Sequence, residues 1–167
     1  CGSGGGTINF VMSIEKIDFK DAIYFLGEEY GIKIDSTKKY NNIHSQILDI
    51  QNIALELYYD NLNSENGKKI LDYLQKRGLD NNTISTFKLG YSDDHWSILL
   101  DKIRKMNFTS DALIQSGLFI NGEKGYYDRF RNRLMFPIFN RNDKAVAFAG
   151  RTLDKNNSVK YINSSGM

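Results

Sequence analysis

The sequence predicts an α+β fold in which a mainly helical N-terminal half is followed by a small antiparallel, β-rich part. Up to residue 117, apolar residues recur at the spacing of amphipathic helices. From residue 118 onward, short apolar runs are separated by polar turn residues, as in hairpins. Helices followed by strands along one chain are the pattern of an α+β domain.

The chain is long enough for one ordinary domain with a small appendage. It has 167 residues, of which 41% are hydrophobic and 13% aromatic, which is enough for a packed core. No run approaches the roughly 18 apolar residues of a membrane span, and no signal segment opens the chain. The single cysteine excludes an internal disulfide and fits a reducing compartment. These features predict a soluble intracellular protein.

The first seven residues, from Cys1 to Thr7, are rich in glycine. They lack the lysine of a Walker loop, and Thr7 stands where a dinucleotide-binding fingerprint needs its third glycine. From composition alone, the stretch is a flexible linker or a cloning scar. The chain also lacks an initiator methionine, which predicts a fragment.

The first predicted helix follows Asp18, a residue type that caps helices, and ends at Gly31. Its apolar positions recur at helical spacing: Ala22, Ile23, Leu26 and Tyr30. Residues 33–42 are polar and rich in lysine, and we predict that they form a linker.

Five further helices are predicted between residues 43 and 117. Their predicted limits are Ile43 to about Asn61, Ser64 to Lys76 with Gly78 as C-cap, a short helix after Asp80, Asp93 through Met106, and Ser110 to Gly117. Asp93 and Asp94 are expected to be caps of the fourth of these helices. Trp96 lies on its apolar face, where a core position is more common than an exposed stacking platform.

Two hairpins are predicted in the C-terminal part. The pair Asn121–Gly122 after an apolar run indicates a tight turn. The runs 134–139 and 144–151, joined by the polar turn 140–143, indicate a second hairpin with one buried face. Pro137 cannot donate a ladder hydrogen bond, so it marks a strand edge or a bulge.

Three arginines precede this second hairpin at every second position: Arg129, Arg131 and Arg133. In an extended chain they would share one face, since successive side chains point to opposite sides. Arg151 and Lys160 add charge near the same end of the sheet. The alternative is a solvated sheet face with salt bridges to acidic residues such as Asp128 and Asp143.

Positive charge is concentrated in this region. Residues 121–167 contain nine Lys and Arg against four Asp and Glu, whereas the other 120 residues contain thirteen against sixteen. Arginine presents a planar fork of donors that suits phosphate, so this distribution favours a polyanion as partner.

Several stretches resemble the catalytic core of bacterial-type DNA primases, the DnaG family. The resemblance rests on these segments: 127–138 (YDRFRNRLMFPI), 147–153 (AFAGRTL), 160–164 (KYINS), 76–79 (KRGL), and 89–91 with Trp96. In the family a proline, an acidic residue and a threonine follow the last of these motifs, whereas here Ser165-Gly166-Met167 follows.

The resemblance implies a domain organisation. Residues 1–32 would be the end of a zinc-binding domain, 33–42 a linker, and 43–167 the N-terminal subdomain of the catalytic core, helical over 43–117 and β-rich over 118–167. Cys1 would be the last Zn²⁺ ligand, and an apolar helix would begin near Ile8. Because structural zinc sites need four ligands, Cys1 alone is not expected to bind Zn²⁺.

The resemblance also implies a function. Primases are nucleotidyltransferases that synthesise short RNA primers from ribonucleoside triphosphates on single-stranded DNA during replication, in the bacterial cytoplasm. In the family, Mg²⁺ or Mn²⁺ is held by the TOPRIM subdomain, and the replicative helicase binds a C-terminal region. Both lie downstream of the matched motifs, so this fragment is predicted to bind nucleic acid without polymerising.

The fragment would then supply the basic wall of the template and primer cleft. The residues expected to bind nucleic acid or nucleotide are Arg77, Arg129, Arg131, Arg151, Lys160, Tyr161 and Asn163. Alternatively, Tyr161 and Asn163 only shape the loop. The positive charge of Arg77 would also stabilise the C-terminal end of its helix through the helix dipole. At least one of Arg129, Arg131 and Arg133 is expected to be buried near Asp128, and Tyr126 and Tyr127 are expected to pack.

Three other interpretations remain open at the level of sequence. The first is part of a phage or plasmid primase–helicase, the second is a non-enzymatic module that binds single-stranded nucleic acid, and the third is an inert globular fragment. A Walker loop downstream would indicate the first, and a stop codon after Met167 would indicate the second.

Overall fold

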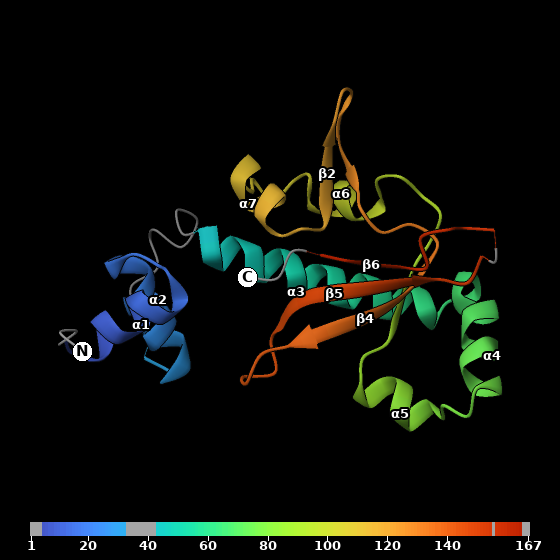
Figure 1. The fold of residues 1–167 in the computed structure, drawn as a ribbon, viewed down its shortest axis with the longest axis horizontal. Coiled ribbons are helices and arrows are strands. Elements are labelled where there is room, and N and C mark those ends of the chain that lie inside the picture. The colour runs from blue at the N-terminus through green and yellow to red at the C-terminus, as the bar shows by residue number, and fades with distance from the viewer. Residues whose placement is uncertain (1–4, 33–42, 155, 165–167) are drawn as a thin grey trace. The chain divides into compact units, whose positions relative to one another are not determined.

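The computed structural model describes residues 5–32, 43–154 and 156–164. It divides into two compact units, residues 1–45 and 46–167 (Figure 1). The expected linker 33–42, Cys1 and the C-terminal residues 165–167 lie outside the described residues. Within the described ranges, no helix has the length and apolar character needed to cross a membrane.

The first unit contains two short helices that pack against each other, α1 (Thr7–Glu15) and α2 (Phe19–Glu29). Asp18 caps α2, since its carboxylate accepts the Asp21 N–H at 2.8 Å. Gly31 follows α2 with a positive φ of 66°. The predicted helix between Asp18 and Gly31 is therefore confirmed.

The second unit is built on the long helix α3 (Ile43–Leu62). Its Tyr58 packs edge-on against Phe148 of the sheet, with ring centroids 5.5 Å apart. Elsewhere on α3, Gln46 Oε1 accepts the Thr109 N–H and Gln51 Nε2 donates to the Ser116 carbonyl, both at 2.8 Å. Thus α3 contacts both the sheet and a separate segment near residues 109–116.

After α3 the chain forms a single 3-10 turn (Glu65–Gly67) and then α4 (Lys68–Lys76). Gly78, with φ of 87°, ends this helix in the left-handed region as predicted. Asp80 then caps α5 (Asn81–Thr86) by accepting the Thr83 N–H at 2.7 Å.

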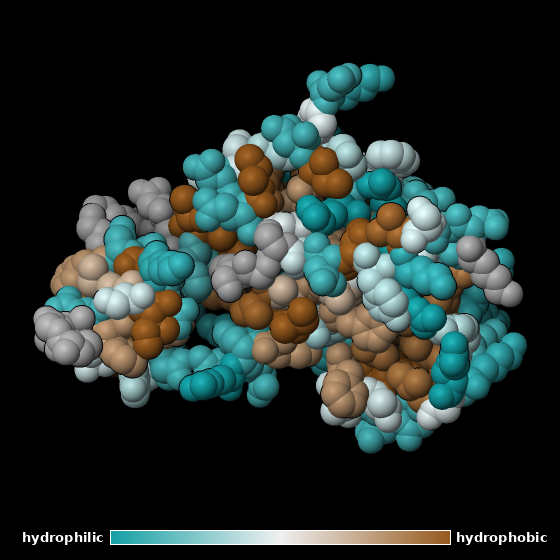
Figure 2. Space-filling view, in the orientation of Figure 1, coloured by the Kyte–Doolittle hydropathy of each residue, from teal (hydrophilic) through white to brown (hydrophobic). Residues whose placement is uncertain are grey.

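Helices α4 and α5 cover one end of the sheet. Their apolar side chains form one buried cluster with residues of α3 and the sheet: Leu62, Ile70, Leu74, Ile84, Leu89, Tyr91 and Leu134. Figure 2 shows hydrophobic side chains gathered where α4 and α5 border the strands. Burial of this cluster fixes the end of α4 relative to the sheet.

The sheet has four antiparallel strands in the order β1 (Gly90–Ser92), β4 (Arg133–Phe139), β5 (Ala145–Thr152) and β6 (Tyr161–Asn163). The predicted β4–β5 hairpin is confirmed. Strand β1 lies between the predicted helices after Asp80 and from Asp93, where no strand was predicted, so the sheet includes a strand from the mainly helical half. Pro137 lies beyond the three residues of β4 that pair with β1, and a register shift follows at Ile138, as expected for an edge or bulge.

The fourth predicted helix is shorter than expected. Helix α6 spans Ile98–Ile103, because the residues before it are used in other contacts. Asp93 accepts the His95 N–H at 3.0 Å, and the carbonyl of Trp96 accepts the Asp128 N–H at 2.8 Å. Asp93 is therefore the acceptor of a local turn and does not cap the helix. Helix α7 (Ser110–Gln115) follows, with Gly117 after it, close to the prediction.

Strands β2 (Phe119–Gly122) and β3 (Gly125–Asp128) form the separate two-stranded hairpin visible beside α6 in Figure 1. The predicted hairpin is confirmed, but its turn is displaced. Asn121 pairs with Tyr126 inside the ladder and Gly122 with Gly125, so Glu123 and Lys124 form the turn.

Candidate nucleic-acid interface

The two faces of the four-stranded sheet have different surroundings. Phe148 of β5 points toward α3, as its ring contact with Tyr58 shows, and Gly150 lies on the same face of the sheet. Arg151 points to the opposite face and pairs with Leu134 on β4 and Tyr161 on β6. This second face, where α4 ends, carries most of the predicted binding residues.

Arg77 and Arg151 meet on this face at one tyrosine, Tyr73. Arg151 Nη1 donates to the Tyr73 hydroxyl at 2.8 Å, and its Cζ lies 5.9 Å from the Tyr73 ring centroid. The Cζ of Arg77 lies 5.6 Å from the same centroid. Arg151 is also 5.7 Å from the ring of Tyr161. We call these four residues the Tyr73 cluster.

The Tyr73 cluster has an electrostatic signature. Burial acts to raise the pKa of the Tyr73 phenol, but hydrogen bonds from Arg77 and Arg151 and their positive charge lower that pKa below its usual value. Among the described side chains, neither arginine forms an ion pair with a carboxylate. Their positive charge is therefore not offset locally.

Tyr161 and Asn163 extend this face along β6, and both are exposed, as is Lys160 just before the strand. The alternation along a strand places Tyr161 and Asn163 on the face of Arg151. The strand itself is fixed by Ser164, whose hydroxyl accepts the Phe148 N–H at 2.9 Å and whose N–H donates to the Phe148 carbonyl at 2.8 Å. The structure therefore brings four predicted residues to this face, Arg77, Arg151, Tyr161 and Asn163, while Lys160 directly precedes β6.

The expectation that Arg129, Arg131 and Arg133 share one strand face is wrong. Strand β3 ends at Asp128 and β4 begins at Arg133, so only Arg133 lies in a strand at this point. Between them, Asn132 has a left-handed φ of 49°, which breaks the extended conformation. The alternating spacing in the sequence marks a connection between strands.

Arg133 is the structural arginine of the three. It is buried, and its guanidinium donates to the carbonyls of Gly150, Lys160 and Val159 at 3.3, 3.3 and 3.2 Å. Burial, together with the charge of Arg131, lowers the pKa of this group. Because its donors bind main-chain carbonyls of β5 and the segment before β6, Arg133 holds that segment against the sheet.

Arg131 lies over an aromatic pair instead. Its Cζ is 3.9 Å from the Trp96 ring centroid and 5.3 Å from that of Tyr127, and its Nη1 donates to the Asp128 carbonyl. Trp96 is 62% exposed, so the expectation of a core tryptophan is wrong. The ring lies outside because α6 begins two residues later, at Ile98. Arg129 is half-buried, and its N–H donates to the Leu118 carbonyl at 2.8 Å.

The residue that caps helix α6 is Asp128, whereas the sequence predicted Asp93 and Asp94 as its caps. Its buried carboxylate accepts the N–H groups of Leu99 and Leu100 at 2.8 and 3.0 Å, at the start of α6. Burial raises the pKa of this carboxyl to about 6, although the two N–H donors and Arg131 act to lower it. A residue 28 positions away caps the helix, so no local pattern indicates it.

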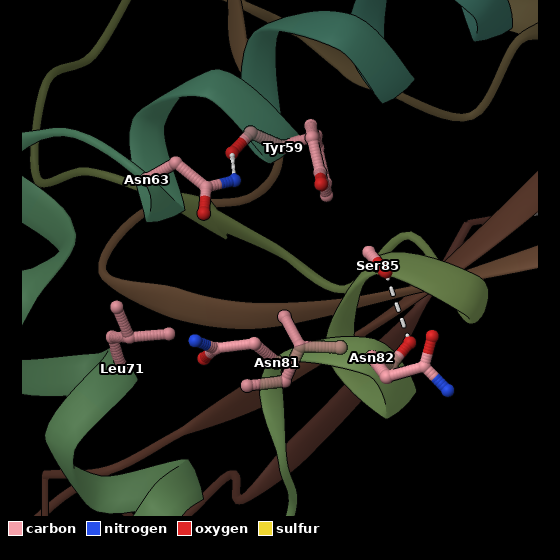
Figure 3. Close-up of a pocket in the computed structure, with 7 residues that line it drawn as sticks. Tyr59, Asn63, Leu71, Asn81, Asn82 and Ser85 are labelled. Atoms are coloured by element: carbon pink, nitrogen blue, oxygen red, sulfur yellow. Dashed lines mark hydrogen bonds between the residues drawn. The ribbon is translucent and has the colours of Figure 1, made fainter.

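An open cavity of about 430 Å³ lies between α3, α4 and α5 (Figure 3). Its polar groups bind one another: the Asn63 amide donates to the Tyr59 carbonyl at 2.8 Å, and the Ser85 hydroxyl to the Asn82 carbonyl at 3.0 Å. None of the predicted binding residues lines it. We therefore assign the candidate interface to the sheet face.

The described residues do not fit a metal site by themselves. No group of three or more His, Cys, Asp or Glu side chains within them is arranged to hold an ion. The expected zinc ligand Cys1 lies outside the described residues.

Sequence reasoning missed Tyr73, which connects Arg77 to Arg151. One signal was present: Tyr73 and Arg77 are four residues apart, a spacing that places side chains on the same side of a helix. The contact with Arg151, 78 residues further along the chain, had no sequence signal.

Comparisons with known proteins identify relatives of both units. The family model for the DNA primase catalytic core, N-terminal domain, matches residues 57–167, and the model for the CHC2 zinc finger matches residues 1–42. A DNA primase from Clostridium acetobutylicum is 35% identical over 173 residues, which cover 98% of this chain. The chain spans 28% of the length of that relative.

Solved structures agree with these matches. A DnaG primase catalytic domain bound to single-stranded DNA superposes with a TM-score of 0.69 and 28% identity, covering 75% of this chain and 40% of that one. The Aquifex aeolicus primase structure, with zinc-binding and RNA polymerase domains, gives a TM-score of 0.65 and 26% identity, covering 99% of this chain and 40% of that one.

Proposed function

Because the chain belongs to the bacterial-type DNA primase (DnaG) family, we propose that it supplies the basic wall along which a primase holds its template and primer. The wall consists of Arg77, Arg151, Lys160, Tyr161 and Asn163. Arg129 and Arg131 are proposed as further contacts, beside the Trp96 ring.

The observation that carries this proposal is the Tyr73 cluster. Two guanidinium groups from α4 and β5 meet there without a carboxylate partner among the described residues. Guanidinium groups bind phosphate oxygens through paired donors, and the exposed ring of Tyr161 offers a surface on which a base can stack. A phosphate backbone with unpaired bases fits this combination.

The activity of the whole protein is part of the proposal. We propose that it synthesises short RNA primers from ribonucleoside triphosphates on single-stranded DNA in the bacterial cytoplasm, and that a replicative helicase is its partner at the fork. Mg²⁺ or Mn²⁺ would offset charge on the reacting phosphates from a TOPRIM subdomain. The 167 residues alone are proposed to bind nucleic acid and to form no phosphodiester bonds.

We also propose the domain limits given by the sequence, with residues 1–32 as the end of a zinc-binding domain and 43–167 as core. The zinc-finger match over residues 1–42 and the division of the structure near residue 45 support them. Cys1 is proposed as a Zn²⁺ ligand that acts only together with ligands beyond these residues.

The test is fluorescence anisotropy of labelled single-stranded DNA across a salt series. Arg151→Ala/Lys160→Ala is compared with wild type and with Arg141→Ala, which removes a charge from the exposed turn between β4 and β5. We expect salt-sensitive binding that weakens at least tenfold in the double variant and less than about twofold in the control. Equal binding by all three proteins, each shown to be folded by circular dichroism, would refute the proposal.

A further inference from the structure

Tyr73 contacts both Arg77 and Arg151 of the proposed wall. It lies in the last turn of α4, and the apolar cluster beneath α4 and α5 includes it as a partly buried member. Its ring therefore has a fixed position, while its hydroxyl reaches the sheet face. A side chain that is held by packing and carries a polar tip is suited to orient flexible neighbours.

The two arginines reach Tyr73 from elements that are far apart in the sequence. Arg77 lies at the end of α4 and is exposed, and its Cζ is 5.6 Å from the ring centroid. Arg151 comes from β5, and its Nη1 is 2.8 Å from the phenolic oxygen. Without this common partner, each long side chain would sample many rotamers, and ordering both on binding would reduce affinity.

The chemistry of the partner matters as much as its position. A carboxylate here would orient the arginines but would also neutralise one of them. A phenol accepts a hydrogen bond while remaining uncharged at neutral pH, so both positive charges stay available to an anion. The hydroxyl also engages only part of the guanidinium fork, which leaves other N–H groups for phosphate oxygens.

We propose that Tyr73 is a positioning residue that holds Arg77 and Arg151 as one paired site for a phosphodiester group of the bound strand. This inference rests on the proposed function, since it assigns the organisation of the same wall. Tyr73 itself need not touch the nucleic acid, and it acts through the two guanidinium groups.

The variant Tyr73→Phe keeps the ring and its packing but removes the hydroxyl. We expect it to weaken single-stranded DNA binding by about threefold to tenfold, the typical net effect of losing one hydrogen bond. The salt dependence should stay unchanged, because no charge is lost. In contrast, Arg77→Ala/Arg151→Ala should lower the slope of log K against log salt by roughly 0.7 for each phosphate contact removed.

Tyr59→Phe is the matched control. Tyr59 of α3 has Lys88 Nζ 4.8 Å from its ring centroid and lines the cavity between α3, α4 and α5, to which no residue of the wall contributes. It should bind DNA like wild type. In the Arg77→Ala/Arg151→Ala background, adding Tyr73→Phe should have no further effect. Wild-type affinity in Tyr73→Phe, or an equal loss with and without the two arginines, would overturn the proposal.

A second measurement separates this inference from the function on which it rests. The difference in ultraviolet titration between wild type and Tyr73→Phe isolates one phenol, which should ionise below the usual pKa of about 10. Arg151→Ala should raise that pKa. If the arginine variants bind DNA as wild type does but this shift is found, the proposed function fails while the contact stands. If the shift is absent, the positioning role fails.

Discussion

The two faces of the four-stranded sheet use arginine in opposite ways. Arg133 and Arg151 occupy neighbouring rungs of the β4–β5 ladder, since Arg133 pairs with Thr152 and Arg151 with Leu134. On the α3 face, Arg133 is buried and donates to three main-chain carbonyls. On the other face, Arg151 donates to a neutral tyrosine hydroxyl.

The difference shows that the local supply of acceptors decides the role of an arginine. The main-chain carbonyls of Gly150, Val159 and Lys160 engage the Arg133 donors, so that side chain stabilises the fold. No carboxylate among the described residues engages Arg77 or Arg151, so their charge remains available for an external anion. Spacing in the sequence does not distinguish these cases.

The largest expected effect concerns the buried arginine. Arg133→Met should lower the free energy of unfolding by about 2–4 kcal/mol, because buried carbonyls lose a charged donor. The close approach of this side chain to Gly150, where a Cβ atom would lie 3.1 Å from Arg133 Cδ, leaves little room for rearrangement. Urea unfolding gives the value. Arg151→Met is the control on the opposite face, with an expected loss below about 1 kcal/mol. Equal losses would remove the distinction between the faces.

The next effect concerns Asp128, the carboxylate that caps α6. Its pKa is raised to about 6 in the fold and is near 4 in an unfolded chain, so the folded state binds the proton more tightly. The stabilising contribution of the protonated form is complete below pH 4 and is lost as the pH rises through 6. Between pH 7 and pH 5, the free energy of unfolding should rise by about 1 kcal/mol from this group.

Asp128→Asn should abolish that contribution, because the amide does not titrate. Urea unfolding of both proteins at several pH values measures the difference between them. A difference that is constant from pH 7 to pH 5 would show that Asp128 does not titrate in this range.

A smaller effect is expected at Trp96. Since the ring is 62% exposed and its main partner is the Arg131 guanidinium, Trp96→Ala should cost about 0.5–1 kcal/mol of unfolding free energy. Thermal unfolding of the two proteins measures this. A loss of about 3–5 kcal/mol, typical of a core aromatic residue, would show that the ring is buried.

The smallest expected effect concerns the donor geometry of Arg151, which a substitution by lysine changes while the positive charge stays. Arg151→Lys should leave stability unchanged and weaken single-stranded DNA binding by about twofold to threefold, because an ammonium lacks the planar fork of donors. Fluorescence anisotropy of labelled single-stranded DNA at one fixed salt concentration measures this change in affinity. Binding equal to that of wild type would show that only the charge of Arg151 matters.

Most of the architecture could be predicted from the sequence because it depends on local signals. The Asp18 and Asp80 caps, the stop at Gly78 and the β4–β5 hairpin all follow from residues close together in the chain. The features that were missed depend on tertiary contacts. Strand β1 pairs with β4, and the carboxylate that caps α6 comes from the end of β3.

The features of the candidate site also divide into those that motifs predicted and those that depend on tertiary contacts. The motifs identified Arg77 and Arg151, but only the fold shows that they share Tyr73. The repeat of Arg129, Arg131 and Arg133 suggested one basic face, whereas the left-handed Asn132 separates Arg133 from the other two, which lie between the strands. Exposure of Trp96 also depends on where α6 begins, which Asp128 fixes from a distant strand.

We propose that Arg151 of the sheet and Arg77 at the end of α4 bind single-stranded DNA, whereas the inward-facing Arg133 maintains the fold. Nuclear magnetic resonance of arginine Nε–Hε groups, assigned with single Arg→Lys variants, tests it most directly. Addition of single-stranded DNA should shift the signals of Arg77 and Arg151 and leave that of Arg133 in place. A shift at Arg133 with none at Arg77 and Arg151 would contradict the account.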